Sequence, residues 1–417
     1  MHSLSICLVM ISAGLAVPLY GGIDPLGYYF LDVEIGNQRM SVILDTGSEG
    51  LSVVCTTCTH CGTEHMDPFF DPQISSSVCN LRECAFRKSY LEGSQLTGRM
   101  YTDSLGLGSD RFFNQKFGCI DSETNLFLEQ KANGILGLAP LAKSYLSQQL
   151  EEFSICLSRT GGDFYPSTIS RVFNTTCTVP MKSVGGHYTV RPSEMRIGQI
   201  SFVTEHEVLI DSGSTVTYFE KGFYTQIWHL ISETVDAYKR ENSRVFTVSG
   251  PGCWTTSVAN ATEDFARLLP PIELSFIALD NSTLTVKFVS YFFKQSDGQV
   301  CLTMASNEHI QRTDLGSSWL IGNNVTFYPK QELLSIQQNA ACTERELSER
   351  VPVPPRPPAP ENSFFPLIGM AFIFLSIAFC LIRVVRNSIS ATYIAVDPQT
   401  AHDFGVSSPA GSNISLE

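Results

Sequence analysis

The chain is poor in basic residues: 28 Lys and Arg stand against 41 Asp and Glu, which gives a net charge of −13 and a pI near 5.1. It also lacks a Gly-rich phosphate-binding loop and any repeated basic patch. These absences argue against nucleic acid as a partner, because binding to phosphates requires a basic surface. An acidic surface is compatible with basic peptide ligands. With 417 residues and 43% hydrophobic content, the chain can bury two cores of ordinary domain size.

Two short motifs of the same type are the most informative feature of the sequence. Each follows an apolar, strand-like stretch and consists of Asp, a hydroxyl residue, Gly and Ser. Such a turn presents a carboxylate with backbone N–H and hydroxyl donors around it. A single copy is more often a structural turn, but two copies with matching flanks indicate a duplicated lobe that brings two carboxylates together. The motifs are Asp45-Thr46-Gly47-Ser48 after Val42-Ile43-Leu44, and Asp211-Ser212-Gly213-Ser214 after Val208-Leu209-Ile210.

Each half also contains a downstream segment in which large aliphatic residues precede a glycine: Gly134-Ile135-Leu136-Gly137 and Trp319-Leu320-Ile321-Gly322. Both are predicted to be buried strands whose glycine lets the loop that carries the Asp approach closely. Over roughly residues 24–343, these four motifs in this order resemble the pepsin-like aspartic proteases. The resemblance implies an all-β, two-lobed fold with a central cleft.

The resemblance also implies a catalytic dyad of Asp45 and Asp211. Two carboxylates about 3 Å apart cannot both ionise cheaply, so the pair holds one proton and activates a water molecule without metal or cofactor. By the same resemblance, Thr46 and Ser212 cross-link the two turns beneath the dyad, while Ser48 and Ser214 hydrogen-bond the outer carboxylate oxygens. Ordinary turn capping explains each of these four hydroxyls equally well when it is taken alone. Gly47 and Gly213 complete the supporting set.

A hairpin that covers the cleft is expected at residues 86–105, where two strand-like arms flank a glycine-containing turn. We call this hairpin the flap. Tyr90 matches the flap tyrosine of the family, with a half-buried strand aromatic as the alternative. Where pepsin-like enzymes usually carry a Trp that donates to this tyrosine, the chain has Ser52. The substrate-binding residues expected in the flap are Tyr90, Glu92, Gly93, Ser94 and Gln95.

Three features together resemble plasmepsin V and related apicomplexan membrane-anchored proteases: Ser52, the flap turn 89–95 and the Cys-rich stretch 55–67. This resemblance implies cleavage after Leu in an Arg-x-Leu motif that marks proteins for export. The substrate arginine would then need acceptors, for which Asp67 and Gln95 are the matching positions and Glu92 the next best. For Asp67, a purely structural place in the loop before Pro68 is an equally good explanation.

The thirteen cysteines indicate an oxidising compartment. The family resemblance implies the disulfides Cys156–Cys342 and Cys253–Cys301. The insert at residues 55–84 is expected to be disulfide-rich, with Cys119 as an outside partner. A zinc site that uses its Cys-x2-Cys spacing with His60 and His65 is the rival interpretation, but no metal is expected.

The two ends predict the topology. Residues 1–16 read as a signal peptide, and residues 364–382 form an apolar run long enough to span a bilayer. Arg383 and Arg386 follow this run, which places the catalytic unit in the lumen. The first strand is expected near Tyr28, which leaves little room for an inhibitory prosegment, so no zymogen step is expected. The full division is 1–16 signal peptide, 17–180 N-terminal lobe, 181–347 C-terminal lobe, 348–363 Pro-rich linker, 364–382 transmembrane helix and 383–417 cytoplasmic tail.

Glycosylation is predicted at the sequons of Asn174, Asn260 and Asn281, whereas Asn324 is expected to stay bare because it follows a buried motif.

The function predicted from the sequence is a type I membrane-anchored aspartic endopeptidase of the endoplasmic reticulum or another secretory compartment. It would act on extended polypeptides. One alternative is a broad-specificity vacuolar or surface protease. An alternative of another class is a catalytically silent, peptide-binding membrane protein.

Overall fold

The computed structural model describes residues 16–354, except 25, 76, 79–83, 141–144, 170–172, 242–245, 251, 257–265, 296–298 and 309–310. The predicted signal peptide (but for residue 16), Asn260, the predicted transmembrane helix 364–382 and the tail 383–417 therefore lie outside the described residues. Within the described part of the chain, no helix is both long and apolar enough to cross a bilayer.

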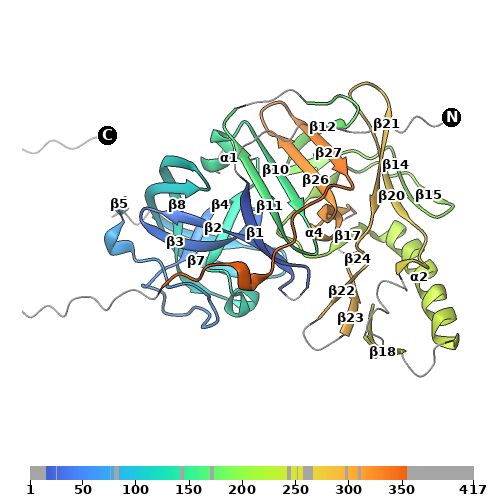
Figure 1. Ribbon diagram of the computed structural model, residues 1–417, viewed down its shortest axis with the longest axis horizontal. Helices are drawn as coiled ribbons and strands as arrows, with labels where there is room; N and C mark the ends of the chain where they lie inside the picture. Colours follow the sequence, from blue (N-terminus) through green and yellow to red (C-terminus); the bar gives the residue numbers. More distant parts are fainter. Residues whose placement is uncertain are drawn as a thin grey trace, which may run out of the picture. The chain divides into compact units, whose positions relative to one another are not determined.

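The fold is mostly β, and six strands drawn from both halves of the chain form its middle (Figure 1). Each pairs antiparallel with the next, so the two halves share one continuous sheet. In spatial order the strands are β1 (Val17–Gly22), β11 (Thr160–Ser167), β10 (Glu152–Leu157), β26 (Asn323–Tyr328), β27 (Leu333–Gln338) and β12 (Thr178–Val184). The first strand thus begins at Val17, and the expectation that it begins near Tyr28 was wrong. Val17, Leu19 and Ile23 are buried in the core, which holds this early segment in place.

The first half positions Asp45 at the end of a buried strand. β3 runs parallel to β9, β9 antiparallel to β4, and β4 parallel to β8. Asp45 lies level with Gly137 of β9. The strands of this half are β2 (Tyr28–Ile35), β3 (Gln38–Asp45), β4 (Glu49–Val54), β5 (Ser77–Val78), β6 (Ala85–Ser89), β7 (Gln95–Leu107), β8 (Asp110–Glu123) and β9 (Gly134–Leu138).

The second half repeats this pattern around Asp211. β16 runs parallel to β25, β25 antiparallel to β17, and β17 parallel to β24. The duplication read from the two Asp motifs is therefore visible in the strand topology itself. The strands involved are β13 (His187–Val190), β16 (Val208–Ile210), β17 (Thr217–Glu220), β24 (Met304–Asn307) and β25 (Asp314–Leu315).

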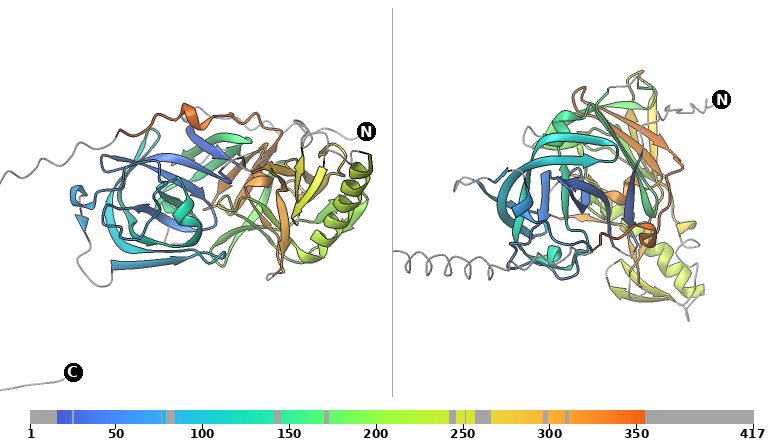
Figure 2. Two further views of the ribbon diagram at one scale, coloured as in Figure 1. Left: turned by 90° about the horizontal axis from the view of Figure 1, so that it is seen from below. Right: turned by 60° about the vertical axis from the view of Figure 1, so that its left-hand side comes forward.

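Two further four-stranded sheets and a long helix complete the second half (Figure 2). Helix α2 (Lys221–Glu241) buries Phe223, Ile227 and Ile231, which recur every four residues and so form one apolar face. One sheet contains β15 (Ile200–Phe202), β14 (Glu194–Ile197), β20 (Ile272–Ile277) and β21 (Thr283–Phe288), and the other β18 (Phe246–Gly250), β19 (Cys253–Thr256), β23 (Gln299–Leu302) and β22 (Phe292–Lys294). In the described ranges, the short helices are η1 (Pro72–Ile74), η3 (Asn125–Glu129), α1 (Tyr145–Gln149), α4 (Ser317–Leu320) and η4 (Leu347–Glu349).

The two glycine motifs behave differently. A Cβ on Gly137 would lie 2.5 Å from the Ser48 carbonyl oxygen, so this glycine admits the loop after Asp45, as predicted. The equivalent prediction for Gly322 was wrong, because residues 317–320 form helix α4 instead of a strand. The close approach in the second half falls to Gly316, where a Cβ would lie 2.2 Å from the Val216 carbonyl oxygen and 2.8 Å from that of Ser214.

Disulfides brace both halves. Cys156 is bonded to Cys342 and Cys253 to Cys301, which are the two pairings that the family resemblance implied. In the Cys-rich insert, Cys55 pairs with Cys119 and Cys58 with Cys61. These thiols are therefore joined to one another and do not surround a metal ion. Instead of a zinc ligand, His65 is a hydrogen-bond partner of Glu123 and of the Ala132 carbonyl.

After β27 the chain crosses back to the first half as a segment that we call the strap, residues 343–351. Its main anchor is Arg350, whose guanidinium donates to Asp32 and to both carboxylate oxygens of Asp67. The Arg350 side chain is 4% exposed and that of Asp67 is fully buried. Burial opposes the charge on Arg350, but the hydrogen bonds and charges of the two Asp residues raise its pKa overall.

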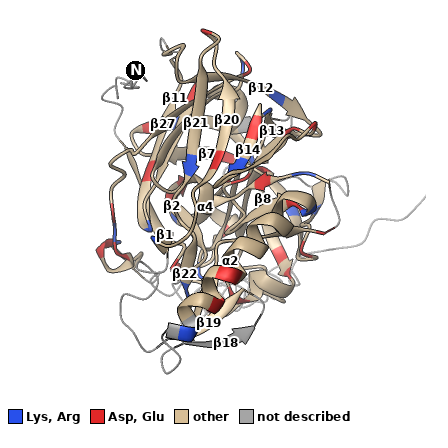
Figure 3. Ribbon diagram, turned by 90° about the vertical axis from the view of Figure 1, so that its right-hand side faces the viewer, with Lys and Arg blue, Asp and Glu red and all other residues tan. Residues whose placement is uncertain are grey.

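Over the rest of the molecule, Lys and Arg residues are dispersed among Asp and Glu residues (Figure 3).

Replacing Arg350 with Ala is expected to lower the free energy of unfolding by about 3–5 kcal/mol, because it leaves the buried carboxylate of Asp67 without its charged partner. Arg111→Ala is the matched control, since Arg111 pairs with Glu34 at the surface and such pairs contribute at most about 1 kcal/mol. Urea denaturation of both variants measures the difference. Equal losses in the two variants would show that the strap is not anchored through this ion pair.

Candidate active site

The two Asp turns have nearly identical hydrogen bonds. Asp45 Oδ1 accepts from the Gly47 N–H at 2.8 Å, and its Oδ2 accepts from the Ser48 hydroxyl. The second turn repeats this arrangement, because Asp211 Oδ1 accepts from the Gly213 N–H at 2.9 Å and its Oδ2 from the Ser214 hydroxyl at 2.7 Å. Each carboxylate is thus fixed by its own turn in the same orientation.

The turns are also bonded to each other through Thr46 and Ser212. The Thr46 N–H donates to the Ser212 hydroxyl at 3.0 Å, and the Ser212 N–H donates to the Thr46 hydroxyl at 2.9 Å. The two hydroxyls in turn donate to carbonyl oxygens in the strand before the opposite turn, Thr46 to Ile210 at 3.0 Å and Ser212 to Leu44 at 2.8 Å. Four buried hydrogen bonds with twofold symmetry therefore lock the two halves together beneath the carboxylates, as the resemblance implied.

This lock places the two carboxylates side by side. A Cβ added to Gly213 would lie 2.4 Å from Asp45 Oδ1 and 3.2 Å from Asp211 Oδ1, so both oxygens crowd the same small space. Asp45 is only 6% exposed. Burial raises the pKa of Asp45 above the ordinary value of 3.8, and the negative charge of Asp211 raises it further. Hydrogen bonds from Ser48 and Gly47 oppose this shift without cancelling it. The pair therefore retains a proton at a pH where isolated Asp side chains are ionised.

The flap forms as predicted. Its arms β6 and β7 pair antiparallel from Ala85↔Arg99 to Ser89↔Gln95, and the turn closes through Tyr90 N–H to the Ser94 carbonyl at 2.9 Å. Gly93 adopts φ +92°, a conformation that favours glycine. The Tyr90 ring packs on Phe127 with centroids 5.0 Å apart.

The Tyr90 hydroxyl is buried and forms no hydrogen bond with the part of the chain that the structure describes. Burial raises its pKa well above the usual range, and the charge of Asp45 adds to this effect. The nearby Ser48 hydroxyl acts in the opposite sense, but it donates its own proton to Asp45. Tyr90 therefore lies beside the dyad with a free donor.

The two residues expected to receive a substrate arginine already bind arginines of this chain. Asp67 is 4% exposed, and besides Arg350 it accepts from the Ser41 N–H at 2.9 Å. The Asp67 carboxylate is thus buried and bound within the chain, and its predicted role in substrate binding stays a prediction. Gln95 accepts from Arg87 across the flap hairpin. Both residues are thus engaged within the chain.

Glu92 is the acidic side chain of the flap tip that remains exposed. Its charge acts on Tyr90 and on Tyr218 of β17, so it lies near residues from both halves. Burial raises the pKa of Tyr218, and the charges of Glu92 and Asp211 contribute. Tyr218 is nevertheless 39% exposed, which makes it a candidate wall of the cleft that the sequence did not reveal.

Lys88 is a second residue of the site that the sequence analysis missed. Its ammonium donates to the Ser52 hydroxyl at 2.9 Å, at the position where a tryptophan is usual in the family. The alternation of side chains along a strand could have revealed it. Phe86, Lys88 and Tyr90 are two residues apart, so their side chains lie on the same, half-buried face of the flap arm.

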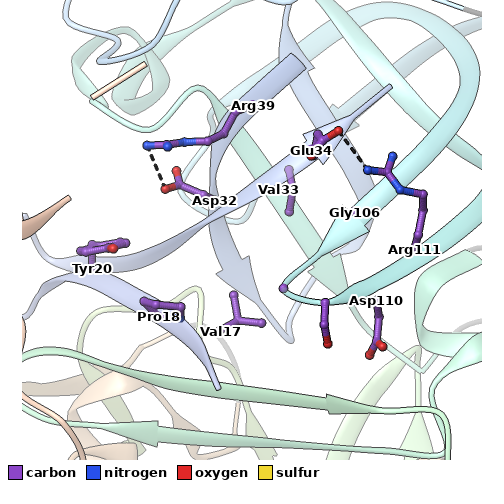
Figure 4. A pocket seen from close by; sticks show the side chains of 12 residues that line it. Val17, Pro18, Tyr20, Asp32, Val33, Glu34, Arg39, Gly106, Asp110 and Arg111 are labelled. Atoms are coloured by element: carbon purple, nitrogen blue, oxygen red, sulfur yellow. Dashed lines mark hydrogen bonds and ion pairs between the residues drawn. The ribbon is translucent and has the colours of Figure 1, made fainter. Parts of the chain in front are cut away.

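A pocket of about 310 Å³ lies elsewhere, over β1, β2 and β7 (Figure 4). Two ion pairs lie in its lining, Arg39–Asp32 at 3.3 Å and Arg111–Glu34 at 3.0 Å. Neither Asp45 nor Asp211 lines it, so this pocket is separate from the dyad.

Of the predicted glycosylation sites, Asn281 is exposed in a turn with φ +65°, and Asn174 is half-buried and accepts from Thr176. Asn324 is 6% exposed within β26, and its lack of a glycan stays a prediction.

Comparison with known families agrees with the twofold site. Residues 28–159 match the family described as eukaryotic aspartyl protease, and residues 187–338 match the family described as xylanase inhibitor C-terminal. Residues 28–159 therefore form a pepsin-like aspartic protease domain.

Individual relatives point in the same direction. Aspartic protease 5 of Toxoplasma gondii is 26% identical over 387 residues, which cover 80% of this chain and 38% of the relative. Plasmepsin V of Plasmodium falciparum is 35% identical over 177 residues, which cover 35% of this chain and 30% of the relative. Aspartic proteinase nepenthesin-1 of Nepenthes gracilis is 25% identical over 76% of this chain and 80% of the relative. The chain thus spans about a third of the length of the two apicomplexan relatives.

Because the native state holds a proton on the dyad that the unfolded chain releases, stability should fall as the pH rises from 4 to 7. Asp45→Asn removes this penalty. We expect the free energy of unfolding of this variant to rise relative to that of the wild type, by roughly 1–3 kcal/mol between pH 4 and pH 7.

Urea denaturation at both pH values provides the measurement. Asp236→Asn is the control, since Asp236 is exposed on α2. The same pH trend in both variants would contradict a raised pKa at Asp45.

Proposed function

We propose that this protein is an aspartic endopeptidase that hydrolyses peptide bonds by activating water between Asp45 and Asp211. The observation that carries the proposal is the pair of carboxylates held side by side by two turns with matching hydrogen bonds and a symmetric cross-link. A merely structural turn would not require a second copy of itself on the opposite side.

The mechanism follows from the shared proton. The ionised carboxylate accepts a proton from water, whose oxygen attacks the peptide carbonyl carbon, while the protonated partner donates to the carbonyl oxygen. When the tetrahedral intermediate collapses, the C–N bond breaks and the leaving nitrogen takes a proton from the dyad. The Gly47, Gly213, Ser48 and Ser214 donors keep each carboxylate oriented throughout these transfers.

In this proposal the flap closes on a substrate in extended form. The unpartnered Tyr90 hydroxyl supplies a donor above the dyad, and the exposed turn residues Glu92 and Gly93 border the chain of the substrate. Ser94 supports the turn from within, since it is fully buried and its hydroxyl accepts from the Leu126 N–H. A covered site excludes water other than the attacking molecule and strengthens the electrostatic interactions inside.

For the compartment, we propose a secretory location with a membrane anchor at residues 364–382. The disulfides support an oxidising environment, and the sequence of the apolar run supports the anchor. Extraction of the expressed protein with carbonate tests the anchor, since an integral protein stays in the membrane pellet.

For specificity, we propose recognition of a basic residue in the substrate, as in an Arg-x-Leu sequence, through Glu92. The exposed carboxylate of Glu92 lies near Tyr90 and Tyr218, whereas Asp67 and Gln95 are engaged by Arg350 and Arg87. The guanidinium of a substrate arginine would donate to the Glu92 carboxylate. A hydrogen bond between these two charged groups is stronger than one between neutral groups.

A peptide-binding protein without catalysis is the competing function. The match of residues 187–338 to a family described as an inhibitor domain favours it, whereas the intact dyad favours hydrolysis.

Asp45→Asn and Asp211→Asn should each lower kcat/KM for peptide hydrolysis by at least about 10³-fold, because either change removes one member of the acid–base pair. Cleavage of a fluorogenic peptide library from pH 4 to 7 measures the loss, with Asp236→Asn as the control. Retained cleavage in both dyad variants would rule out the mechanism. Peptide binding without cleavage by the wild type would support the non-catalytic alternative.

Glu92→Gln should reduce the preference for Arg over Ala in the substrate by about tenfold in kcat/KM, because the carboxylate that faces the guanidinium is lost. Asp67→Asn should leave this preference unchanged even if it destabilises the fold. Matched fluorogenic peptides containing Arg-x-Leu or Ala-x-Leu give the ratio for each variant. A loss of preference in Asp67→Asn alone would return the specificity role to Asp67.

A further inference from the structure

Lys88 connects the flap to the segment that follows the first dyad turn. It lies on β6, and its ammonium donates to the carbonyl of Glu49, to the carbonyl of Gly50 at 3.3 Å and to the hydroxyl of Ser52 at 2.9 Å. An ammonium has three N–H donors. Three oxygen acceptors on one short stretch of β4 therefore satisfy it completely.

The position of this stretch gives the contact its importance. Residues 49–52 follow Ser48 directly, and β4 is held between β8 and β9. Ser52 is fully buried. The base of the flap is thus tied to a rigid strand that begins where the Asp45 turn ends, while Tyr90 lies two residues beyond Lys88 on the same face of the hairpin.

Holding a cation in this place is costly. Burial lowers the pKa of Lys88 to about 8, against the charges of Asp45 and Glu49, which favour the protonated form. A methionine of similar length would avoid the desolvation cost, so the charge itself must serve the site.

We propose that Lys88 is a positioning residue which clamps the flap to residues 49–52, sets the place of Tyr90 above the dyad, and favours the ionised form of Asp45 through its positive charge. This inference rests on the proposed proteolytic function.

The direction of the electrostatic effect follows from the groups that surround Lys88. Asp45 and Glu49 act on it directly. Asp211 acts on Asp45, and Glu92 acts on Tyr90. Loss of the cation removes a positive charge that interacts with Asp45 and Glu49, so the dyad should bind its proton more tightly. The ionised member of the dyad is required for activity, and the acidic limb of the rate profile should therefore shift to higher pH.

Four variants of the full-length protein in detergent separate the clamp from the charge. Lys88→Met should raise KM about tenfold and shift the acidic limb of kcat/KM upward by roughly half a pH unit or more. Lys88→Arg keeps the charge but not the three-point geometry, so it should raise KM and leave the pH profile in place. Ser52→Ala should behave like Lys88→Arg. Lys221→Met, an exposed lysine on α2 that is paired with Glu308, should change neither quantity.

Unchanged KM and an unchanged pH profile in folded Lys88→Met would overturn the inference. If this variant does not fold, the test rests on Lys88→Arg. A raised KM with the wild-type pH profile of kcat/KM supports the clamp, and a KM equal to that of the wild type refutes it. Hydrogen exchange of the amides in residues 85–89 gives a measurement that needs no activity. About tenfold faster exchange in Lys88→Met, but not in Lys221→Met, supports the clamp. If the wild type cleaves no peptide, the proposed function fails, and the exchange result alone judges the clamp.

Discussion

Two carboxylates in one buried space repel each other, and the rest of this structure serves to hold them there. Asp45 and Asp211 come from different halves of the chain, so neither half can form the pair alone. The reciprocal hydrogen bonds of Thr46 and Ser212 impose the approach, and each bond donates into the opposite half. Beneath them, Gly137 and Gly316 leave room for the loops to pass, since a Cβ at either position would collide with a carbonyl oxygen.

Lys and Arg side chains of this chain occupy several of the acceptors that a basic substrate could otherwise bind. Arg350 pairs with Asp32 and Asp67, Arg87 binds Gln95, and the charge of Asp45 acts on Lys88. Each contact joins segments far apart in the sequence or on opposite arms of the flap. Acceptors that are open to a substrate are therefore fewer than the acidic composition suggests, and Glu92 stands out because it is exposed at the flap tip.

Much of the site could be predicted from the sequence because its chemistry is local. The Asp turns and the flap depend on neighbouring residues, and Gly137 was recognised by the aliphatic residues directly before it; all three appear where the motifs indicated. What the sequence did not reveal involves contacts that only the fold creates. Asp67 is occupied by Arg350, which lies 283 positions later in the chain. The Trp319-Leu320-Ile321-Gly322 run has strand-like residues, but Ser317–Leu320 form a helical turn because the preceding β25 already supplies the strand parallel to β16.

The central claim is that Asp45 and Asp211 share one proton. Carbon-13 NMR of the Asp side-chain carboxyls, recorded between pH 3 and pH 8 for the wild type and for Asp211→Asn, tests it directly. The account predicts that the wild type has one carboxyl resonance that titrates well above the ordinary Asp range, and that this titration moves back toward that range when Asp211 becomes neutral. If every Asp of the wild type titrated within the ordinary range, or if the Asp45 resonance did not respond to Asp211→Asn, the two carboxylates would not form a dyad.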